Sequence, residues 1–206
     1  MAGKLPEGAV LISNLKCKEM GILVPTYYDP RWDNDFDHFL ESEQLDEITL
    51  GELEEQGIIS ISGGHGSPGN DQRVGEVPYI KVSDIRNLRI NINPTNMVPF
   101  PLAEKLWGGT NSGLQAWDLI TPNRASSNIG EFAMLLPGEE DIVLTKEVFV
   151  IRIKSCFEQG WSPFYLMWAF CLTSVRKQWK RIALMQTNRE DVSSRYKEIR
   201  LPFPKS

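Results

Sequence analysis

Residues 57–99 place a glycine-rich loop between two strand-like segments, and this arrangement constrains the fold more than any other feature of the chain. Ile58–Ser62 alternates apolar and polar residues, as a half-buried strand does. A second strand is predicted over Val77–Val82, and the glycine-rich segment 63–75 lies between them. Glycine permits backbone conformations that other residues rarely adopt. We therefore expect a scaffold that holds a shaped loop toward a partner.

Size and composition predict one globular domain. The chain has 206 residues, 41% of them hydrophobic, and its six Trp and nine Phe can fill a sizeable core. Residues 1–45 are assigned to an N-terminal arm and residues 46–206 to the domain. We expect a mixed α/β (α+β) class with mixed and antiparallel strands and a long C-terminal helix.

Local patterns predict the order of the elements within this domain. Thr49 is suited to cap a short helix that ends at Gly57, and a further short helix is expected to end at Gly108. Further strands are predicted over Leu88–Ile92, Trp117–Thr121 and Ile199–Pro204. A hairpin-like pair is expected from Glu131–Leu136 and Ile142–Ile153, with its turn at Pro137 and Gly138.

The strongest helix signal covers Ser162–Met185. Ser162 suits the N-cap and Pro163 the first helical position, and apolar residues recur at helical spacing. Its second half carries the cations Arg176, Lys177, Lys180 and Arg181. We expect the first half to lie in the core. The second half is either a solvated polar end or an approach to a phosphate backbone.

Charge is distributed unevenly along the chain. The net charge is −5 with a pI near 5.2, which is the wrong sign for a simple DNA coat. Residues 29–56 hold eleven Asp and Glu and one Arg, a net −10, whereas residues 145–206 hold twelve Lys and Arg and five acids, a net +7. We expect one acidic and one basic face. Two solvated faces without a partner are the plainer alternative.

Metal and targeting signals are weak. The three cysteines form no CxxC pattern and only two histidines are present, so we expect no zinc site. Asp33, Asp35 and Asp37 do not form a calcium loop, because His38 and Gln44 stand where Gly and Glu are needed. With no apolar leader or membrane-length segment, we expect a soluble, cytoplasmic protein.

Catalytic motifs are missing as well. The chain has no (D/E)xK nuclease element, no Asn/Asp-Pro-Pro-Tyr/Phe methyltransferase motif and no GxxxxGK[ST] loop. His65 has no recognised local nucleophile motif beside it, although triads can assemble across a fold. We expect no enzymatic activity and no cofactor in this chain.

Three polar loops offer groups suited to DNA. They are named the first loop (residues 63–75), the second loop (residues 123–130) and the third loop (residues 186–195). Arg, Asn and Gln can read base edges, whereas Ser, Thr and Lys suit phosphate oxygens. The candidate contacts are His65, Ser67, Asn70, Gln72, Arg73, Lys81, Arg124, Ser126, Ser127, Asn128, Lys177, Lys180, Arg181, Thr187 and Arg189.

The order of motifs over residues 45–204 resembles a known family. Leu50–Leu53 leads into a strand and Gly-rich loop, Val77–Ile85 reads VPYIKVSDI, Asp118–Gly130 contains DLI, Arg and IG, and Ile199–Pro204 closes the domain. This sequence resembles the target-recognition domains of type I restriction–modification specificity subunits and of related fused adenine methyltransferases. A full subunit of that family carries two such domains joined by long helices, whereas only one is found here.

The resemblance implies recognition of one half-site of duplex DNA without chemistry. A partner methyltransferase subunit would bind S-adenosylmethionine, and a restriction or motor subunit could join the complex. The acidic residues 29–56 could dock such a partner, and a homodimer would restore two half-sites. The main rival is a protein-interaction module of the same fold that has lost DNA binding. A hydrolase centred on His65 is a third reading.

Overall fold

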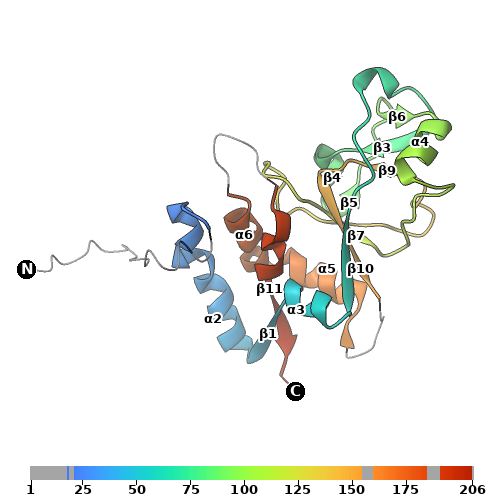
Figure 1. Ribbon diagram of the computed structural model, residues 1–206. Coiled ribbons are helices and arrows are strands. Elements are labelled where there is room, and N and C mark those ends of the chain that lie inside the picture. Colours follow the sequence, from blue (N-terminus) through green and yellow to red (C-terminus); the bar gives the residue numbers. More distant parts are fainter. Residues whose placement is uncertain (1–17, 19–20, 155–159, 185–190, 206) are drawn as a thin grey trace, which may run out of the picture.

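The computed structural model describes residue 18 and residues 21–154, 160–184 and 191–205 (Figure 1). Its α-helices are α2 (Asn34–Glu43), α3 (Leu50–Glu55), α4 (Phe100–Trp107), α5 (Pro163–Cys171) and α6 (Thr173–Ile182). The short 3-10 helices are η1 (Pro25–Tyr28), η2 (Pro30–Trp32), η3 (Asn70–Gln72), η4 (Val82–Asp84) and η6 (Ser193–Glu198). No helix within the described ranges has the length and apolar character needed to cross a membrane.

The strands form one larger sheet and three smaller units. They are β1 (Leu45–Thr49), β2 (Ile59–Gly63), β3 (Val77–Ile80), β4 (Ile85–Arg86), β5 (Arg89–Ile90), β6 (Met97–Val98), β7 (Leu119–Pro122), β8 (Ala133–Met134), β9 (Val143–Leu144), β10 (Val148–Ile153) and β11 (Arg200–Pro204). The larger sheet is antiparallel in the order β2-β10-β7-β8. The predicted mixed α/β class with mixed and antiparallel strands is confirmed.

Two of the smaller units lie at opposite ends of the molecule, and the third lies between them beside the larger sheet (Figure 1). A three-stranded unit, β6-β3-β9, has an antiparallel β3–β6 pair and a parallel β3–β9 pair. Strands β4 and β5 form a hairpin, and β1 pairs with β11. Figure 1 shows β3, β6, β9 and α4 gathered at one end, with α2, α6, β1 and β11 toward the other.

Aromatic residues build the main core around α5 and α6. Phe132 stacks on Phe170 with ring centroids 4.1 Å apart, and Trp179 meets Phe132 edge-on at 5.5 Å. All three side chains are fully buried, so each contributes a large apolar area to folding. These contacts fix the two helices relative to the strand segments that carry the polar loops.

The predicted long C-terminal helix is broken at Leu172. Helix α5 ends at Cys171, Leu172 is extended with φ −61° and ψ 128°, and α6 begins at Thr173. The Leu172 carbonyl accepts the Arg176 N–H at 3.0 Å, and the Arg176 guanidinium donates to the Phe170 carbonyl at 3.2 Å. Arg176 thus satisfies a carbonyl that the end of α5 leaves free, which stabilises the break.

The predicted hairpin of residues 131–136 and 142–153 is wrong. A turn does lie at Gly138, which has φ +91°. The segments on either side pair elsewhere: β8 with β7, β9 in parallel with β3, and β10 with β2 and β7. The predicted turn at Pro137 and Gly138 is therefore confirmed, whereas the strands on either side of it pair with distant strands.

Two predicted strands are shorter than expected. The strand predicted over Val77–Val82 ends at Ile80, because η4 begins at Val82. The strand predicted over Leu88–Ile92 keeps only β5, because Leu88 has φ +65° and belongs to a turn.

Local signals at helix ends are confirmed. The Thr49 hydroxyl accepts the Glu52 N–H at 3.1 Å and the Glu52 carboxylate accepts the Thr49 N–H at 2.7 Å, a reciprocal capping box. The Ser162 hydroxyl accepts the Tyr165 N–H at 3.1 Å and caps α5. Gly108, with φ +72°, ends α4.

The segment that precedes β1 packs onto the rest of the molecule. Tyr27 of η1 and Phe36 and Leu40 of α2 are buried in the same apolar cluster as Trp179 of α6. The end of the predicted arm thus contributes to the core, and the domain boundary at residue 45 stays a prediction.

Candidate nucleic-acid interface

The first and second loops lie on the two sides of one turn. This turn, residues 145–147, joins β9 to β10. At the start of β10 the Val148 carbonyl accepts the Gly64 N–H of the first loop at 3.1 Å. The Glu147 carbonyl accepts the Asn123 N–H of the second loop at 3.0 Å. We name the first loop, the turn and the second loop together the polar edge.

The described end of the third loop joins the same edge. The Val192 N–H donates to the Asn123 carbonyl at 2.7 Å, and the Asp191 carboxylate lies 3.7 Å from the Arg124 guanidinium. The three loops predicted from separate parts of the sequence are therefore neighbours. Strands β7 and β10 supply the rigid support.

Gly64 allows the first loop to approach the turn. An ideal Cβ at Gly64 would lie 2.0 Å from the Thr145 carbonyl oxygen, a distance that no side chain tolerates. At Gly63 a Cβ would meet nothing within 4 Å. The glycine-rich character of the loop is thus required at Gly64 by a close backbone approach.

His65 has both ring nitrogens engaged with backbone groups. Its Nδ1 accepts the Leu144 N–H at 2.9 Å, and its Nε2 donates to the Ser112 carbonyl at 2.9 Å. Burial lowers the pKa of His65, while the hydrogen bond to Ser112 acts in the opposite direction. The side chain is a neutral brace between the first loop and two other segments, and its contact with DNA stays a prediction.

Arg73 is turned toward the protein. Its guanidinium donates to the Pro68 carbonyl at 2.9 Å and lies 4.9 Å from the centroid of the Tyr79 ring. This cation–π contact and the hydrogen bond shape the end of the first loop. Reading of a base by Arg73 would require the guanidinium to leave both partners.

The other candidates of the first loop are exposed. The Ser67 hydroxyl lies 3.1 Å from the Thr145 hydroxyl, and the Gln72 carboxamide oxygen accepts the Gly69 N–H at 2.9 Å. The Asn70 side chain makes no hydrogen bond with the residues that the structure describes. Asn70 and the amide nitrogen of Gln72 are therefore available to a partner.

Candidates in the second loop mostly have internal partners. The Asn128 amide donates to the Val82 carbonyl at 3.1 Å, which places the loop next to half-buried Lys81. The Arg124 guanidinium donates to the Glu147 carboxylate at 2.7 Å. Arg124 is therefore partly neutralised before any partner arrives.

A hollow of about 410 Å³ gathers candidates from the second loop and α6. Ser126 and Ser127 line it together with Lys180, Arg181 and Trp32. Lys180 is exposed and forms no ion pair with a described residue. Two hydroxyls and a free ammonium group are groups that suit a phosphate. The sequence placed these residues in separate segments, and the fold brings them together.

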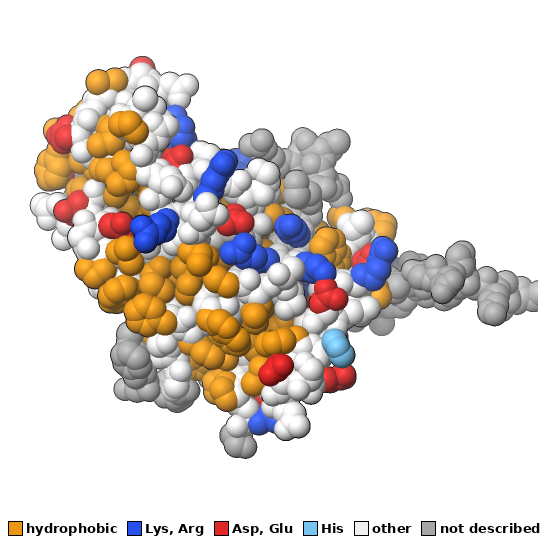
Figure 2. Space-filling view, turned by 180° about the vertical axis from the view of Figure 1, so that it is seen from behind, with side chains coloured by type: hydrophobic (Ala, Val, Ile, Leu, Met, Phe, Trp, Pro, Cys, Tyr) orange, Lys and Arg blue, Asp and Glu red, His pale blue; other side chains and the backbone are white. Residues whose placement is uncertain are grey.

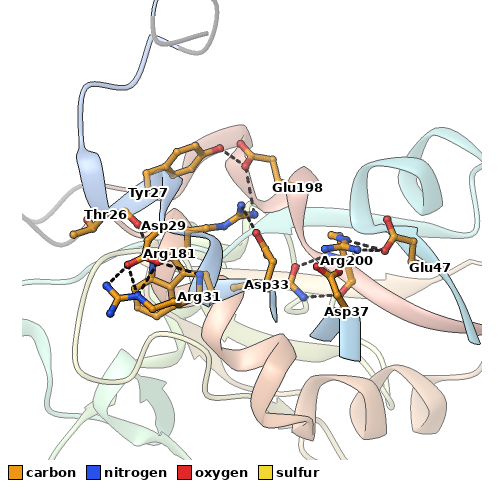
Figure 3. A network of polar contacts seen from close by, with 12 residues as sticks. Thr26, Tyr27, Asp29, Arg31, Asp33, Asp37, Glu47, Arg181, Glu198 and Arg200 are labelled. Atoms are coloured by element: carbon orange, nitrogen blue, oxygen red, sulfur yellow. Dashed lines mark hydrogen bonds and ion pairs between the residues drawn. The ribbon is translucent and has the colours of Figure 1, made fainter. Parts of the chain in front are cut away.

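Acids of residues 33–54 pair with four of the C-terminal cations, in what we name the polar seam; Figure 3 shows part of it. The ion pairs are Lys177–Asp35, Arg181–Asp33, Lys197–Glu54, Arg200–Asp37 and Arg200–Glu47. Figure 3 shows Arg181 and Arg200 directed at acids of the N-terminal segment. The expectation of separate acidic and basic faces is wrong for these residues, because the two charged segments meet.

Tyr27 completes the polar seam near Arg181. The Tyr27 hydroxyl donates to the Glu198 carboxylate, and the Arg181 guanidinium lies 5.3 Å from the Tyr27 ring centroid (Figure 3). Burial, followed by the hydrogen bond to Glu198, raises the pKa of Tyr27. The hydroxyl therefore remains a donor at neutral pH and ties η1 to η6.

Of the four α6 cations, three have acidic partners. Arg176 lies 3.3 Å from Glu131, and Lys177 and Arg181 belong to the polar seam. Lys180 alone remains without an ion pair in the described part of the chain. The sequence left two roles open for α6, a solvated polar end or an approach to a phosphate backbone. If α6 contacts phosphate, Lys180 is the main candidate.

Four residues remain to be placed: two predicted candidates and two cations that were not predicted. Thr187 and Arg189 lie outside the described residues, so their roles stay predictions. Arg86 and Arg89 are exposed next to η4 and were not among the candidates. The signal that could have found them is an Arg-Asn-Leu-Arg run, in which Asn marks a turn between two cations.

Among known proteins, this chain is similar to solved structures, three of which are described here. No protein-family model and no curated protein sequence matches the chain. The HsdS subunit from Thermoanaerobacter tengcongensis matches with a TM-score of 0.45 and 11% identity, over 78% of this chain and 33% of that one. The S subunit of a type I restriction–modification system from M. genitalium matches with a TM-score of 0.45 and 13% identity, over 93% and 45%.

The third structure, described as the assembly and conformational transition of the type I R-M system, matches with a TM-score of 0.46 and 13% identity. It covers 92% of this chain and 46% of the matched chain. This chain therefore spans less than half of each of these three chains.

Proposed function

We propose that this chain recognises a short sequence in duplex DNA as a specificity component, or recognition domain, of a restriction–modification system. The observation that carries the proposal is the polar edge, in which loops from distant parts of the sequence stand side by side on one sheet. Side chains such as Asn70 and Gln72 can read base edges, while Ser126, Ser127 and Lys180 suit phosphates.

The charge balance of the molecule supports a contact with few phosphates. The polar seam neutralises Lys177, Arg181, Lys197 and Arg200. The exposed cations of the polar edge and its hollow are Lys146 and Lys180. Each phosphate neutralised by a protein contributes about 0.9 to the salt dependence of binding. We therefore expect modest affinity for the chain alone and tighter binding within a complex.

In this proposal the chain performs no chemistry. A partner adenine methyltransferase would bind S-adenosylmethionine and flip the target base, and a restriction subunit could cut the DNA. The exposed acids Glu41, Glu43 and Asp46 are the docking candidates, because they have no ion pair among the described residues. Charge reversal at these three positions should weaken assembly and leave DNA contact intact; unchanged assembly would exclude this docking role.

The direct test is selection of bound sequences from a randomised duplex pool, followed by fluorescence anisotropy at low and at moderate salt. An enriched motif of a few base pairs, with affinity that falls as salt rises, is the expected result. Two half-sites would need a second recognition domain or a homodimer, so the length and symmetry of the motif report on assembly. No binding at low salt, alone or with a methyltransferase subunit, would refute the proposal.

Two lysines of α6 give a matched pair of variants. Lys180→Gln should reduce the slope of log affinity against log salt by about 1, because it removes one phosphate contact. Lys177→Gln makes the same charge change on the same helix, but Lys177 is paired with Asp35. It should therefore leave the slope unchanged. Equal effects of both variants would argue against the hollow as the contact.

A protein-interaction module is the second candidate, and the exposed face of α5 favours it. The Phe164 and Trp168 side chains are 56% and 44% exposed, and the Trp117 ring lies 5.2 Å from that of Phe164. Figure 2 shows hydrophobic side chains gathered on the face seen from behind, below a band that holds Lys, Arg and acids. Exposed apolar patches of this kind mark interaction surfaces. Loss of complex formation in Phe164→Ser without any loss of DNA binding would assign this face to a protein partner.

A further inference from the structure

The β4–β5 hairpin places two arginines side by side. In its register Arg86 lies directly opposite Arg89, and Ile85 lies opposite Ile90. Successive side chains of a strand point to opposite faces. Ile85 is fully buried and Ile90 packs on the same apolar cluster, so Arg86 and Arg89 share the outer face. Both arginines are exposed.

The turn of this hairpin holds an unfavourable backbone conformation. Asn87 and Leu88 have φ of 53° and 65°, the left-handed region that a type I′ turn requires at both central residues. Asparagine tolerates this region, whereas leucine rarely adopts it. Backbone of this kind persists where the surrounding structure enforces it, often at functional sites.

The sheet enforces this conformation through Leu88. The Leu88 carbonyl accepts the Met134 N–H of β8 at 3.3 Å. Its side chain lines a hollow of about 290 Å³ together with Met134, Leu136 and Phe164. The hairpin is therefore anchored at its tip as well as at its base, and the two arginines are held on a rigid support.

The two arginines lack acidic partners. Neither guanidinium forms an ion pair or a hydrogen bond with a residue in the described ranges. Like charges directly opposite in a sheet destabilise it. Two nearby acids are held by backbone N–H groups and not by these arginines: the Glu139 carboxylate accepts the Leu136 N–H at 2.9 Å, and the Asp84 carboxylate accepts the Lys81 N–H at 2.9 Å. The hairpin thus concentrates positive charge that the protein itself does not neutralise.

The hairpin is continuous with the polar edge. Helix η4 leads directly into β4, and its Val82 carbonyl accepts the Asn128 amide of the second loop at 3.1 Å. A duplex that contacts the second loop would therefore meet the hairpin on the same approach. The two guanidiniums extend the row of polar groups beyond the three predicted loops.

We propose that Arg86 and Arg89 together bind the phosphate backbone of the DNA that the polar edge recognises. This inference rests on the proposed function and assigns an anchoring element to it. Cross-strand partners that are hydrogen-bonded have Cα atoms about 5.5 Å apart, so both guanidiniums can reach one phosphate or two adjacent ones. The planar fork of an arginine matches phosphate oxygens in two-point contacts. The anionic ligand removes the repulsion between the two cations.

The test compares single and double variants with glutamine at these positions. Arg86→Gln with Arg89→Gln should lower the slope of log affinity against log salt by about 0.9 if the pair binds one phosphate and by about 1.8 if it binds two. The loss of affinity should be the same for the selected motif and for an unrelated duplex, because phosphates carry no sequence information. Lys154→Gln is the charge-matched control for each single variant, since Lys154 is exposed at the end of β10 opposite the polar edge.

A thermal melt separates this role from a structural one. The double variant should unfold at the same or a higher temperature than the unmodified chain, because like-charge repulsion is removed. A lower melting temperature would overturn the inference by making the pair structural. An unchanged salt slope in a double variant that still binds DNA would also overturn the inference, but it would not affect the proposed function. A loss confined to the selected motif would indicate base reading and also overturn the inference. Absence of any binding by the unmodified chain, alone or with a methyltransferase subunit, would instead refute the proposed function.

Discussion

Replacing Arg152 by methionine should destabilise the fold by about 3 kcal/mol. The Arg152 guanidinium donates from Nε and Nη2 to the two oxygens of Asp118 at 2.7 and 2.6 Å, and from Nη2 to the Gly113 carbonyl at 2.8 Å. Asp118 is 1% exposed, and the Arg152 side chain is 29% exposed. Breaking a buried pair by removing one partner costs about 3–5 kcal/mol, and the partial exposure of Arg152 places the cost near the lower end.

That cost should lower the melting temperature by about 6–12 °C, since 1 kcal/mol corresponds to roughly 2–4 °C in a domain of this size. Urea unfolding followed by tryptophan fluorescence measures it. Adding Asp118→Asn should recover part of the loss, because a neutral amide is less costly to bury and can still accept the Gln115 N–H, as Asp118 does at 2.9 Å. Exposed Lys154→Met should change little. A loss below about 1 kcal/mol for Arg152→Met would refute the reasoning, because Asp118 would then need no charged partner.

Three further changes test the local structure. Gly64→Ala should open the first loop and raise amide hydrogen exchange at His65, whereas Gly63→Ala should not, because its added Cβ meets nothing within 4 Å. Since the pKa of His65 is lowered in the folded state, stability should be complete above about pH 6.5 and should fall as the pH drops below it. In a series of urea unfolding midpoints between pH 5 and 8, His65→Gln should remove the loss of stability at low pH. An unaltered pH dependence would exclude His65 as the cause of that loss. Thr49→Ala should cost about 1 kcal/mol in urea unfolding by removing the capping box of α3, and no measurable loss would contradict that role.

Features set by a few neighbouring residues could be predicted from the sequence. The caps at Thr49 and Ser162 and the helix end at Gly108 each depend on one side chain or one φ angle. The mixed class followed from short strands and frequent turns. These signals are local, so they need no knowledge of the rest of the chain.

Features set by distant residues could not be predicted in the same way. The helix break at Leu172 depends on Arg176 reaching back to the Phe170 carbonyl, within an apolar run that looks continuous. The pairing of β9 with β3 joins residues more than sixty positions apart, and the turn at Gly138 gave no sign of it. Periodicity reports which face is apolar and does not report which strand will cover the open edge.

The sequence predicted several residues of the candidate site, but it did not predict which of them lie together or which cations have acidic partners. Ser126, Ser127 and Lys180 were chosen from separate segments, and the fold places them around one hollow. Lys177 and Arg181 looked equivalent to Lys180 in the sequence, but both have acidic partners. Whether a cation is free depends on what packs against its helix, which composition does not reveal.

The polar seam changes what the net charge of −5 implies for DNA binding. Acids of the N-terminal segment form ion pairs with cations of α6 and β11, so part of the negative charge is balanced within the protein before any duplex binds. The exposed cations near the polar edge that have no acidic partner among the described residues are Arg86, Arg89, Lys146 and Lys180. If all four contact phosphates, the salt slope of the unmodified chain should be about 3.6, at about 0.9 per phosphate. A slope near that value would show that binding follows the unpaired cations and not the pI. A slope near zero, with binding retained, would mean that contact is made through the neutral side chains of the loops alone.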